Sequence, residues 1–590
     1  MRLSTKHANQ QTVSFSDFSG GLNTTDAVEM LAQNELARAV NVEIYKGQLK
    51  TVAGTKTVYS DEGKAFNYII YDAIESKILV TDTAHNVYLL EDGTLTLKGQ
   101  LTGVSSVVYA AWEDGVLIAS GGRMQYYHGG TLETISNSFP DDIAKWTETA
   151  LKTWAESTAY TAGSLVTYDS KYYVCSLEHT SGTEFKADNW NEATISVWAF
   201  NTTYTKNVSV VKADDKYYVA NITHTSITDA PSACRGVFVK EGRVWTYYGD
   251  ELHASAVGDE TSWTSDSNDS SSAQWLQIGY KDGGSIVGVC SLSSDTLIFK
   301  DNHHAYHLAG SFPDWTVSEI GRQVDCKGFN CCVALGNSTV VLGKTKVQNV
   351  AVTDTYGDMM ATDISAKVVS NITNLPSDVR MRYIPQLNQV WLMQRDTAFL
   401  FLDVNTGGWF ERRYATSAVD AVEADEQVYV LKEHSVAILD STNMTDEGIA
   451  LRWQFQPKSL MSNNAYLIKR IRVDTTPIHL NYADGTFTVG HVKAELAQPQ
   501  TAYCIYHDYT GICRSRRLIY NEKHTALYTN SDEVYDNPEY IYHSTVQLKS
   551  VDMFRSDVRC VDREREVKVL GRGAGGMTIF NAIGFDIAEV

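Results

Sequence analysis

KILVTDTAHNVYLLEDGTLTL, residues 77–97, reads as short apolar strands joined by polar turns, and this pattern decides the fold. Apolar and polar residues alternate within the strands, as expected for a sheet with one buried face. Six further hairpins of this kind follow, and they begin at Gly115, Gly242, Asp295, Ser338, Gln389 and Gln427. Such regular repetition of small sheets favours an all-β chain with a β-propeller-like repeat scaffold. A set of stacked β-sandwiches is the alternative that the sequence leaves open.

One segment before the hairpins has a different period. In residues 27–43, AVEMLAQNELARAVNVE, apolar residues recur near helical spacing without Gly or Pro, which predicts a short N-terminal helix. The predicted organisation is an N-terminal arm and helix (1–60), a first part of the propeller (61–146), an inserted pair of small β modules (147–232), a second part of the propeller (233–450) and a C-terminal β domain that closes the scaffold (451–590).

The composition is that of a folded protein with an acidic surface. Of the 590 residues 43% are hydrophobic and 21% charged, and the formal net charge is −21. An acidic chain is poorly suited to grip phosphates, but it can line a channel through which DNA passes without sticking. The start has no apolar core of a secretory signal, and no run is long enough for a membrane helix. Nine scattered cysteines without a CxxC pair indicate reduced thiols in a protein made in the cytoplasm.

The segment 154–226 contains a tandem repeat. Trp154, Tyr160 and His179 recur as Trp198, Tyr204 and His224, at a period of 44–45 residues. Aromatic rings with polar neighbours are suited to stacking on sugars. The candidate glycan-binding residues are Trp154, Tyr160, Tyr172, His179 and Trp190. The alternative is that these side chains form the core of a very small domain.

No motif nominates a catalytic residue, a cofactor site or a metal site. GRGAGG, residues 571–576, precedes a strand-like segment, which favours a turn or bulge over a phosphate-binding loop. His303 and His307 would lie about 13 Å apart on one strand, too far to share one ion. Arg514, Arg516 and Arg517 precede DEVYDNPE (532–539), which favours a hairpin with cross-strand ion pairs over a nucleic-acid patch.

The first repeat resembles the small chitin-binding type of carbohydrate-binding module. The resemblance rests on aromatic, glycine and histidine positions in matching order, namely Trp154, Tyr160, Gly163, Val166, Tyr168, Tyr172, Cys175, His179, Ser181, Phe185 and Trp190. The second repeat has Lys206 where the pattern has Gly, and it lacks the Ser-Gly turn after its histidine. Ligand binding is therefore expected in the first repeat.

The rest of the chain resembles the tail nozzle (packaged-DNA stabilisation) proteins of short-tailed bacteriophages. The resemblance is carried by residues 15–55, 242–263 with 284–310, and 569–590. It implies a propeller-bearing structural subunit of the virion tail, without enzymatic activity or cofactor, that forms a homohexameric ring beneath the head-to-tail adaptor. Double-stranded DNA would pass through the lumen of this ring without specific binding.

Two other functions stay open at this point. The first is a glycan- or receptor-binding tail protein whose adhesive part is the insertion. The second is a polysaccharide-degrading propeller enzyme, which would need two facing carboxylates about 5–10 Å apart. The sequence identifies no such pair.

Overall fold

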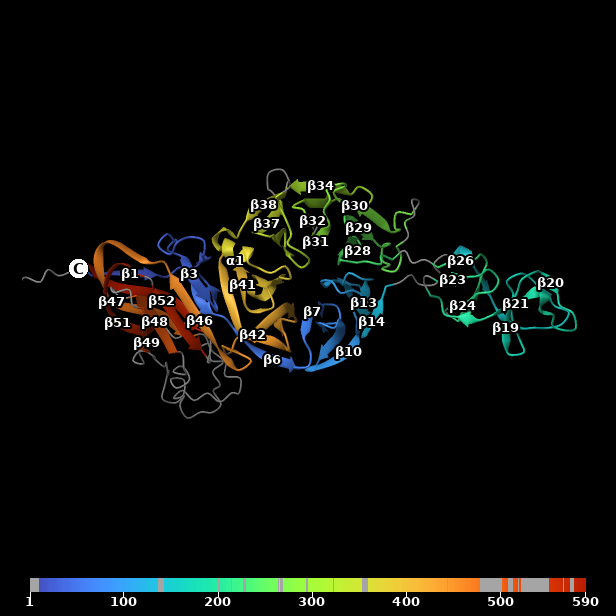
Figure 1. Ribbon diagram of the computed structural model, residues 1–590, viewed down its shortest axis with the longest axis horizontal. Helices are drawn as coiled ribbons and strands as arrows, with labels where there is room; N and C mark the ends of the chain where they lie inside the picture. The colour runs from blue at the N-terminus through green and yellow to red at the C-terminus, as the bar shows by residue number, and fades with distance from the viewer. Residues whose placement is uncertain are drawn as a thin grey trace, which may run out of the picture.

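The computed structural model is built almost entirely of β-strands (Figure 1). Its one α-helix within the described residues is α1 (Val369–Thr373), and short 3-10 turns are η1 (Ile143–Lys145), η2 (Ala187–Asn189), η3 (Ala366–Val368) and η4 (Pro385–Leu387). The structure describes residues 10–135, 143–199, 202–213, 215–226, 230–263, 265, 269–292, 295–321, 323–352, 359–442, 444–477, 501–507, 513–517, 519–520, 551–565, 567–573 and 578–589.

Seven four-stranded blades form a β-propeller within these ranges. Blade 1 consists of β7 (Phe66–Asp72), β8 (Lys77–Asp82), β9 (Asn86–Glu91) and β10 (Thr94–Gln100). Blade 2 consists of β11 (Val108–Trp112), β12 (Gly115–Ala119), β13 (Gln125–His128) and β14 (Thr131–Thr134). Blade 3 consists of β27 (Gly236–Lys240), β28 (Arg243–Tyr248), β29 (Glu251–Ala254) and β30 (Gln274–Gln277). Blades 4 and 5 are β31 (Ile286–Ser291), β32 (Thr296–Lys300), β33 (Ala305–Ala309) and β34 (Thr316–Gly321); and β35 (Cys332–Leu335), β36 (Ser338–Leu342), β37 (Val347–Val352) and β38 (Met359–Asp363).

Blades 6 and 7 share one long strand, β42 (Trp409–Ala424). Its first half completes blade 6 with β39 (Arg380–Ile384), β40 (Gln389–Met393) and β41 (Asp396–Asp403). Its second half begins blade 7 with β43 (Gln427–Lys432) and β44 (Ser435–Asp440), and β6 (Gly54–Ser60) pairs with β44 as the outermost strand. Neighbouring blades contact each other in order, and β42 against β7 closes the ring.

The seven predicted hairpins are confirmed. Each supplies the two middle strands of one blade, from β8 and β9 in blade 1 to β43 and β44 in blade 7. The ring of blades excludes the stacked β-sandwiches that the sequence left open.

The helix predicted for residues 27–43 is wrong. Residues 28–34 form turns, and β3 (Glu35–Val40) and β4 (Val42–Tyr45) follow. Between the two strands, Asn41 adopts a φ of 53° and its amide donates to the carbonyls of Arg413 and Arg452 at 2.8 and 2.7 Å. Pairing of β3 with distant strands satisfies its backbone in place of helical hydrogen bonds, so tertiary contacts override the apolar spacing.

Both ends of the chain build a second body beside the propeller, here called the terminal body. Its strands are β1 (Gln10–Phe15), β2 (Gly21–Leu22), β3, β4, β5 (Gln48–Thr51), β45 (Thr445–Asp446), β46 (Ile449–Pro457), β47 (Leu460–Pro477), β48 (Thr501–His507), β49 (Cys513–Arg517), β50 (Ile519–Tyr520), β51 (Val551–Arg565), β52 (Val567–Gly573) and β53 (Thr578–Glu589). β1 and β5 both pair with β53, so residues near the two ends lie in one sheet. The strand that closes the propeller, β6, also comes from the N-terminal segment.

The terminal body and the propeller share one hydrophobic core. Phe455 and Phe580 of the terminal body belong to the same buried cluster as Trp391 of the propeller. Across this junction Glu43 of β4 contacts the fully buried Arg412 of β42 at 3.2 Å. Burial raises the pKa of the Glu43 carboxyl, but Lys50 and Arg412 outweigh burial and hold that pKa below its ordinary value. The two bodies are therefore joined by packing and by a buried ion pair.

Candidate functional site

Two small β modules occupy the chain between blades 2 and 3, and they lie at the end of the molecule opposite the terminal body (Figure 1). Module 1 contains β16 (Leu151–Thr153), β17 (Ala159–Tyr160), β18 (Leu165–Tyr168), β19 (Lys171–Cys175), β20 (His179–Thr180) and β21 (Trp190–Ala193). Module 2 contains β15 (Trp146–Thr149), β22 (Ile195–Ser196), β23 (Thr203–Tyr204), β24 (Val210–Ala213), β25 (Lys216–Ala220) and β26 (His224–Thr225).

The two sequence repeats exchange their first strands. β15 precedes every strand of module 1, yet it pairs with β25 of module 2. β21 opens the second repeat, yet it pairs with β19 of module 1. Each module is therefore completed by a strand from the other repeat.

The exchanged strands carry equivalent tryptophans. Trp190 packs edge-on against Tyr160 with ring centroids 5.0 Å apart, and Trp146 packs in the same way against Tyr204 at 4.9 Å. Because Trp146 occupies in module 2 the place that Trp190 occupies in module 1, the repeat begins at Trp146. This start is one position before the predicted start of the insertion at 147.

The modules also share a core. Leu165 and Val174 of module 1 form one buried cluster with Val210 and Val219 of module 2. Side chains at equivalent positions of the two hairpins thus meet at a common interface. Because the modules share a core and exchange strands, the pair forms one folding unit rather than two independently folding domains.

Two of the candidate glycan-binding residues lie in the core of module 1. Tyr160 and Trp190 are only 4% and 6% exposed. The Tyr160 hydroxyl accepts a hydrogen bond from the backbone N–H of Ala155 at 2.8 Å. Neither ring presents a free face to a sugar, so their position agrees with the alternative that they hold the small domain together.

The other three candidates differ in their surroundings. The Nδ1 atom of His179 lies 2.8 Å from the Leu177 carbonyl and the ring packs edge-on against Trp190, which anchors a turn. Tyr172 is 38% exposed. Trp154 is half-buried and lies edge-on to Tyr168 at 5.5 Å.

An aromatic face surrounds Trp154, and sequence reasoning missed most of it. It consists of Trp154, Tyr168, Tyr173 and Phe185, with Tyr168 stacked on Phe185 at 4.3 Å and 12°. Tyr168 is 39% exposed and the others are half-buried. In module 2 the position of Tyr168 is taken by Ala213, since both precede the same two-residue turn in their hairpins. The aromatic face is therefore a property of module 1.

The axis of the propeller is spanned by a polar network. The Asn330 amide donates to the Val107 carbonyl at 3.0 Å and accepts from Arg382 at 3.1 Å, and Arg382 donates to Asp420 at 2.8 Å. Burial lowers the pKa of the Arg382 guanidinium, but Asp420 outweighs burial and raises that pKa above its ordinary value. These residues come from the inner ends of blades 2, 5, 6 and 7, so the network joins blades across the axis.

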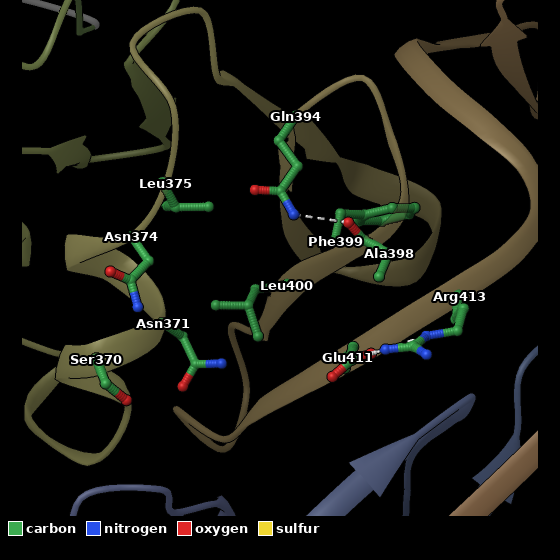
Figure 2. A pocket seen from close by; sticks show the side chains of 10 residues that line it. All are labelled: Ser370, Asn371, Asn374, Leu375, Gln394, Ala398, Phe399, Leu400, Glu411 and Arg413. Carbon is green, nitrogen blue, oxygen red and sulfur yellow. Dashed lines mark hydrogen bonds and ion pairs between the residues drawn. The ribbon is translucent and has the colours of Figure 1, made fainter.

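A cavity of about 280 Å³ lies between α1 and blade 6 (Figure 2). The side-chain amides of Asn371, Asn374 and Gln394 line it together with the apolar side chain of Leu400. Glu411 is the one carboxylate of its lining and is paired with Arg413 at 2.6 Å. The lining therefore lacks the two facing carboxylates that glycoside hydrolysis needs.

The histidines in and beside the β32–β33 turn of blade 4 contact separate carboxylates. His303, His304 and His307 contact three different carboxylates, those of Asp325, Glu319 and Asp295, at 3.1, 2.8 and 2.7 Å. Among the residues that the structure describes, no group of histidines, cysteines and carboxylates is arranged to hold a metal ion.

Two other sequence motifs lie in the terminal body. Gly571 to Gly573 belong to β52, and the remainder of GRGAGG lies outside the described residues. The triplet Arg514, Arg516 and Arg517 belongs to β49, which pairs with β48. The acidic stretch 532–539 proposed as its partner also lies outside the described residues.

Comparison with known proteins gives structural neighbours alone. No family model and no curated protein sequence matches the chain. Solved structures that match include a computationally designed protein, Ika8 (11% identity, 65% of this chain and 99% of that one, TM-score 0.31), and BamB from Moraxella catarrhalis (8%, 66% and 97%, 0.32). The WD40 β-propeller domain of Doa1 matches at 10% identity, over 66% and 97% of the two chains, with a TM-score of 0.33. In the part of the chain that the structure describes, no helix is long and apolar enough to span a membrane.

Proposed function

We propose that this chain is a structural subunit of a bacteriophage tail, a nozzle that assembles as a ring, retains packaged DNA and lets it pass at ejection. The proposal rests on how the segments that resemble tail nozzle proteins are arranged in the fold. Residues 15–55 and 569–590 lie near opposite ends of the chain, yet their strands β5 and β53 pair in one sheet of the terminal body. The third segment, residues 242–263 with 284–310, contributes strands to blades 3 and 4. The resemblance therefore covers a connected scaffold rather than scattered strands.

The DNA passage of such an assembly would lie between subunits. The propeller axis is filled by the network of Asn330, Arg382 and Asp420, so the duplex cannot thread a single propeller. A ring of identical subunits needs a heterologous interface whose rotation closes. With a net charge of −21, such a ring would repel phosphates along much of its lumen.

The ring is tested by the mass of the purified full-length protein and of the particle that contains it. One subunit has a mass of 65.5 kDa, and native mass spectrometry should find a complex of six times that mass. Electron microscopy of virions would then place the ring at the distal end of the tail. A protein that is strictly monomeric and absent from the particle would refute the proposal.

A second role, glycan binding by module 1, is favoured by its aromatic face. The stacked pair Tyr168 and Phe185 is partly open to solvent, whereas the equivalent surface of module 2 has lost Tyr168. Chitin oligosaccharides are the probe that the module's resemblance suggests. Tyr168→Ala should weaken their binding roughly five-fold, since an aromatic contact contributes about 1 kcal/mol.

The matched control for this role is Tyr217→Ala, which removes a tyrosine from module 2. Isothermal titration of the full-length protein should show unchanged affinity for this variant, and Tyr168→Ala, at a ring that is 39% exposed, should keep the melting temperature of the wild type. Equal loss of affinity in both variants, or no binding by the wild type, would remove the aromatic face from consideration as a glycan site.

A further inference from the structure

The cavity between α1 and blade 6 has one wall made by a strand pair (Figure 2). Leu400 of β41 lies directly opposite Glu411 of β42. Two residues further along each strand, Ala398 lies opposite Arg413. Residues opposite one another share a face of a sheet, and so do residues two apart on one strand. These four side chains therefore belong to one face of blade 6, and that face lines the cavity.

The other wall is the polar side of α1. Ser370, Asn371 and Asn374 lie on one side of the helix, because side chains three or four residues apart are neighbours there. Ile372 lies on the opposite side and is fully buried in the core that the propeller shares with the terminal body. The Thr24 hydroxyl donates to Oδ1 of Asn371 at 2.7 Å and so fixes the orientation of that amide. The NH₂ group of Asn371 is therefore turned toward the strands (Figure 2).

The hydrogen bonds within the lining leave both donors and acceptors available to a ligand. Gln394 donates its Nε2 to the Ala398 carbonyl at 2.9 Å, so its Oε1 is left as an acceptor on the helix side of the cavity (Figure 2). Glu411 accepts two hydrogen bonds from Arg413, at 2.6 and 3.1 Å, and both end on Oε1. Within the described part of the chain, no group donates to Oε2 of Glu411, and the side-chain amide of Asn374 has no hydrogen-bond partner.

The charges and the apolar side chains of the lining restrict the class of ligand. Its one carboxylate and its one guanidinium, those of Glu411 and Arg413, are paired at 2.6 Å, so neither an anion nor a cation finds an unpaired counter-charge there. Phe399 is the aromatic residue of the lining, and at 2% exposure it offers no ring face for stacking. The other apolar side chains are aliphatic, namely Leu375, Ala398 and Leu400. The lining therefore fits a neutral, non-aromatic ligand whose groups both donate and accept hydrogen bonds.

We propose that this cavity binds one neutral sugar ring. Each hydroxyl of a sugar has one O–H donor and two acceptor lone pairs, so adjacent hydroxyls can bond to the free amides and to the carboxylate at once. The C–H groups of the ring contact the aliphatic side chains of the lining. A volume of about 280 Å³ is at the lower end of ligand pockets, which suits one ring rather than a long oligosaccharide. Because the lining has a single carboxylate, the site binds the sugar without hydrolysing it.

The proposed sugar site is distinct from the aromatic face of module 1 and requires neither that face nor the ring of subunits. It lies on blade 6 of the propeller, and its recognition depends on amides and a carboxylate rather than on stacked aromatic rings. The two sites are therefore separable by substitution.

Saturation-transfer NMR of the full-length protein tests the proposal, with D-glucose, D-galactose, D-mannose and N-acetyl-D-glucosamine as separate probes. A ligand of this size should bind with a dissociation constant of roughly 2 mM. Asn374→Leu removes an exposed amide and should weaken binding roughly five-fold, the effect of about one net hydrogen bond. Glu411→Gln keeps the shape of the side chain and should weaken binding roughly ten-fold, because a hydrogen bond to a carboxylate is the stronger kind. Both variants should keep the wild-type melting temperature, since Arg413, which loses its partner, is exposed.

The matched control is Asn337→Leu, which makes the same change at an exposed Asn in the turn between β35 and β36 of blade 5. Its affinity for the sugar should equal that of the wild type. Failure of all four sugars to bind, or an equal loss in the control, would overturn the proposal. So would binding of inorganic phosphate in place of the sugars, which would make the cavity an anion site.

The methyl glycosides of the same sugars identify the source of the ring. Binding of a methyl glycoside as strong as that of its parent sugar would support a terminal unit of a glycan as the ligand. Rejection of the methyl glycoside beside binding of the parent sugar would support the free monosaccharide.

The same measurements separate this proposal from the functions proposed above. Sugar binding that is lost in Tyr168→Ala but kept in Asn374→Leu and Glu411→Gln would place the sugar in module 1 and refute the cavity site alone. The mass of the same sample is measured in parallel, so a monomer that binds the sugar in the cavity refutes the ring alone.

Discussion

Trp146→Ala should unfold module 2 although Trp146 precedes every residue of module 1. The indole is 4% exposed and packs against Tyr204 and His224 at 4.9 and 5.1 Å. Removal of a buried Trp side chain costs about 3–5 kcal/mol. The buried core cluster around Trp146 has only four other residues, Tyr204, Val211, Tyr218 and Ala220. A loss of about 3–5 kcal/mol should therefore exceed the free energy that stabilises the fold of module 2.

Hydrogen exchange of the full-length protein, followed by mass spectrometry of peptides, locates the effect. Peptides covering β23 to β26, residues 203–225, should lose protection, and the shared core should transmit a smaller loss to β18 and β19. Peptides from blades 2 and 3 should keep wild-type protection. The control Trp154→Ala, at a half-buried ring of module 1, should leave β23 to β26 unchanged.

The reasoning would be refuted if exchange increased only near residue 146 while β25 stayed protected. In that case β15 would be a dispensable edge rather than a required strand of module 2. The same logic applies to fragments: 143–232 should fold on its own, and 147–232, which lacks Trp146, should not.

Three further outcomes are expected. Glu43→Gln should reduce the free energy of unfolding by about 3–5 kcal/mol at pH 7, because Arg412 is left buried without its carboxylate. The pKa of Glu43 is lowered in the folded protein, so this stabilisation is present above the ordinary pKa of 4.5 and is lost as the pH falls through the lowered pKa. The urea-unfolding curves of variant and wild type should therefore converge below pH 4.5. Lys432→Met should leave the buried Asp446 without its cation and reduce exchange protection of β6, and unchanged protection there would contradict this. Gly21→Ala should lower the melting temperature, since Gly21 has a φ of 65° and an added Cβ would lie 2.7 Å from the backbone of β42; an unchanged value would argue against that geometry.

The propeller was predictable because its signal is local. Each hairpin contains its own alternation and turn, so the middle strands of every blade can be read within one short stretch of sequence. The N-terminal segment was not predictable in this way, because Leu36 and Val40 at helical spacing are also buried positions of a strand. The choice between helix and strand there was decided by β46, which follows in the chain only after the last blade.

Trp154 of the aromatic face was among the residues predicted from the sequence, and one overlooked turn explains why the other members of that face were not. Asp169 and Ser170 both have positive φ and form a two-residue hairpin turn, which fixes the register of β18 and β19. That register places Tyr168 and Tyr173 on one face and Tyr172 on the other. The strand exchange had no local signal, since all of module 1 separates β15 from β25 in the chain.

Closure of the propeller by β6 sets an order of events during synthesis. Ser60 pairs with Ser435, so the ribosome must add all the other blades and both modules before the partner strand exists. At about 5–20 residues per second, β6 remains without its partner strand for roughly 20–75 s. During this time the nascent chain exposes a strand edge that any neighbouring nascent copy can also bind. Slower initiation of translation spaces the ribosomes along the messenger RNA and so separates neighbouring nascent chains. Slower elongation lengthens the time that β6 lacks its partner strand. Slower initiation should therefore raise the yield of correctly closed propellers more than slower elongation does.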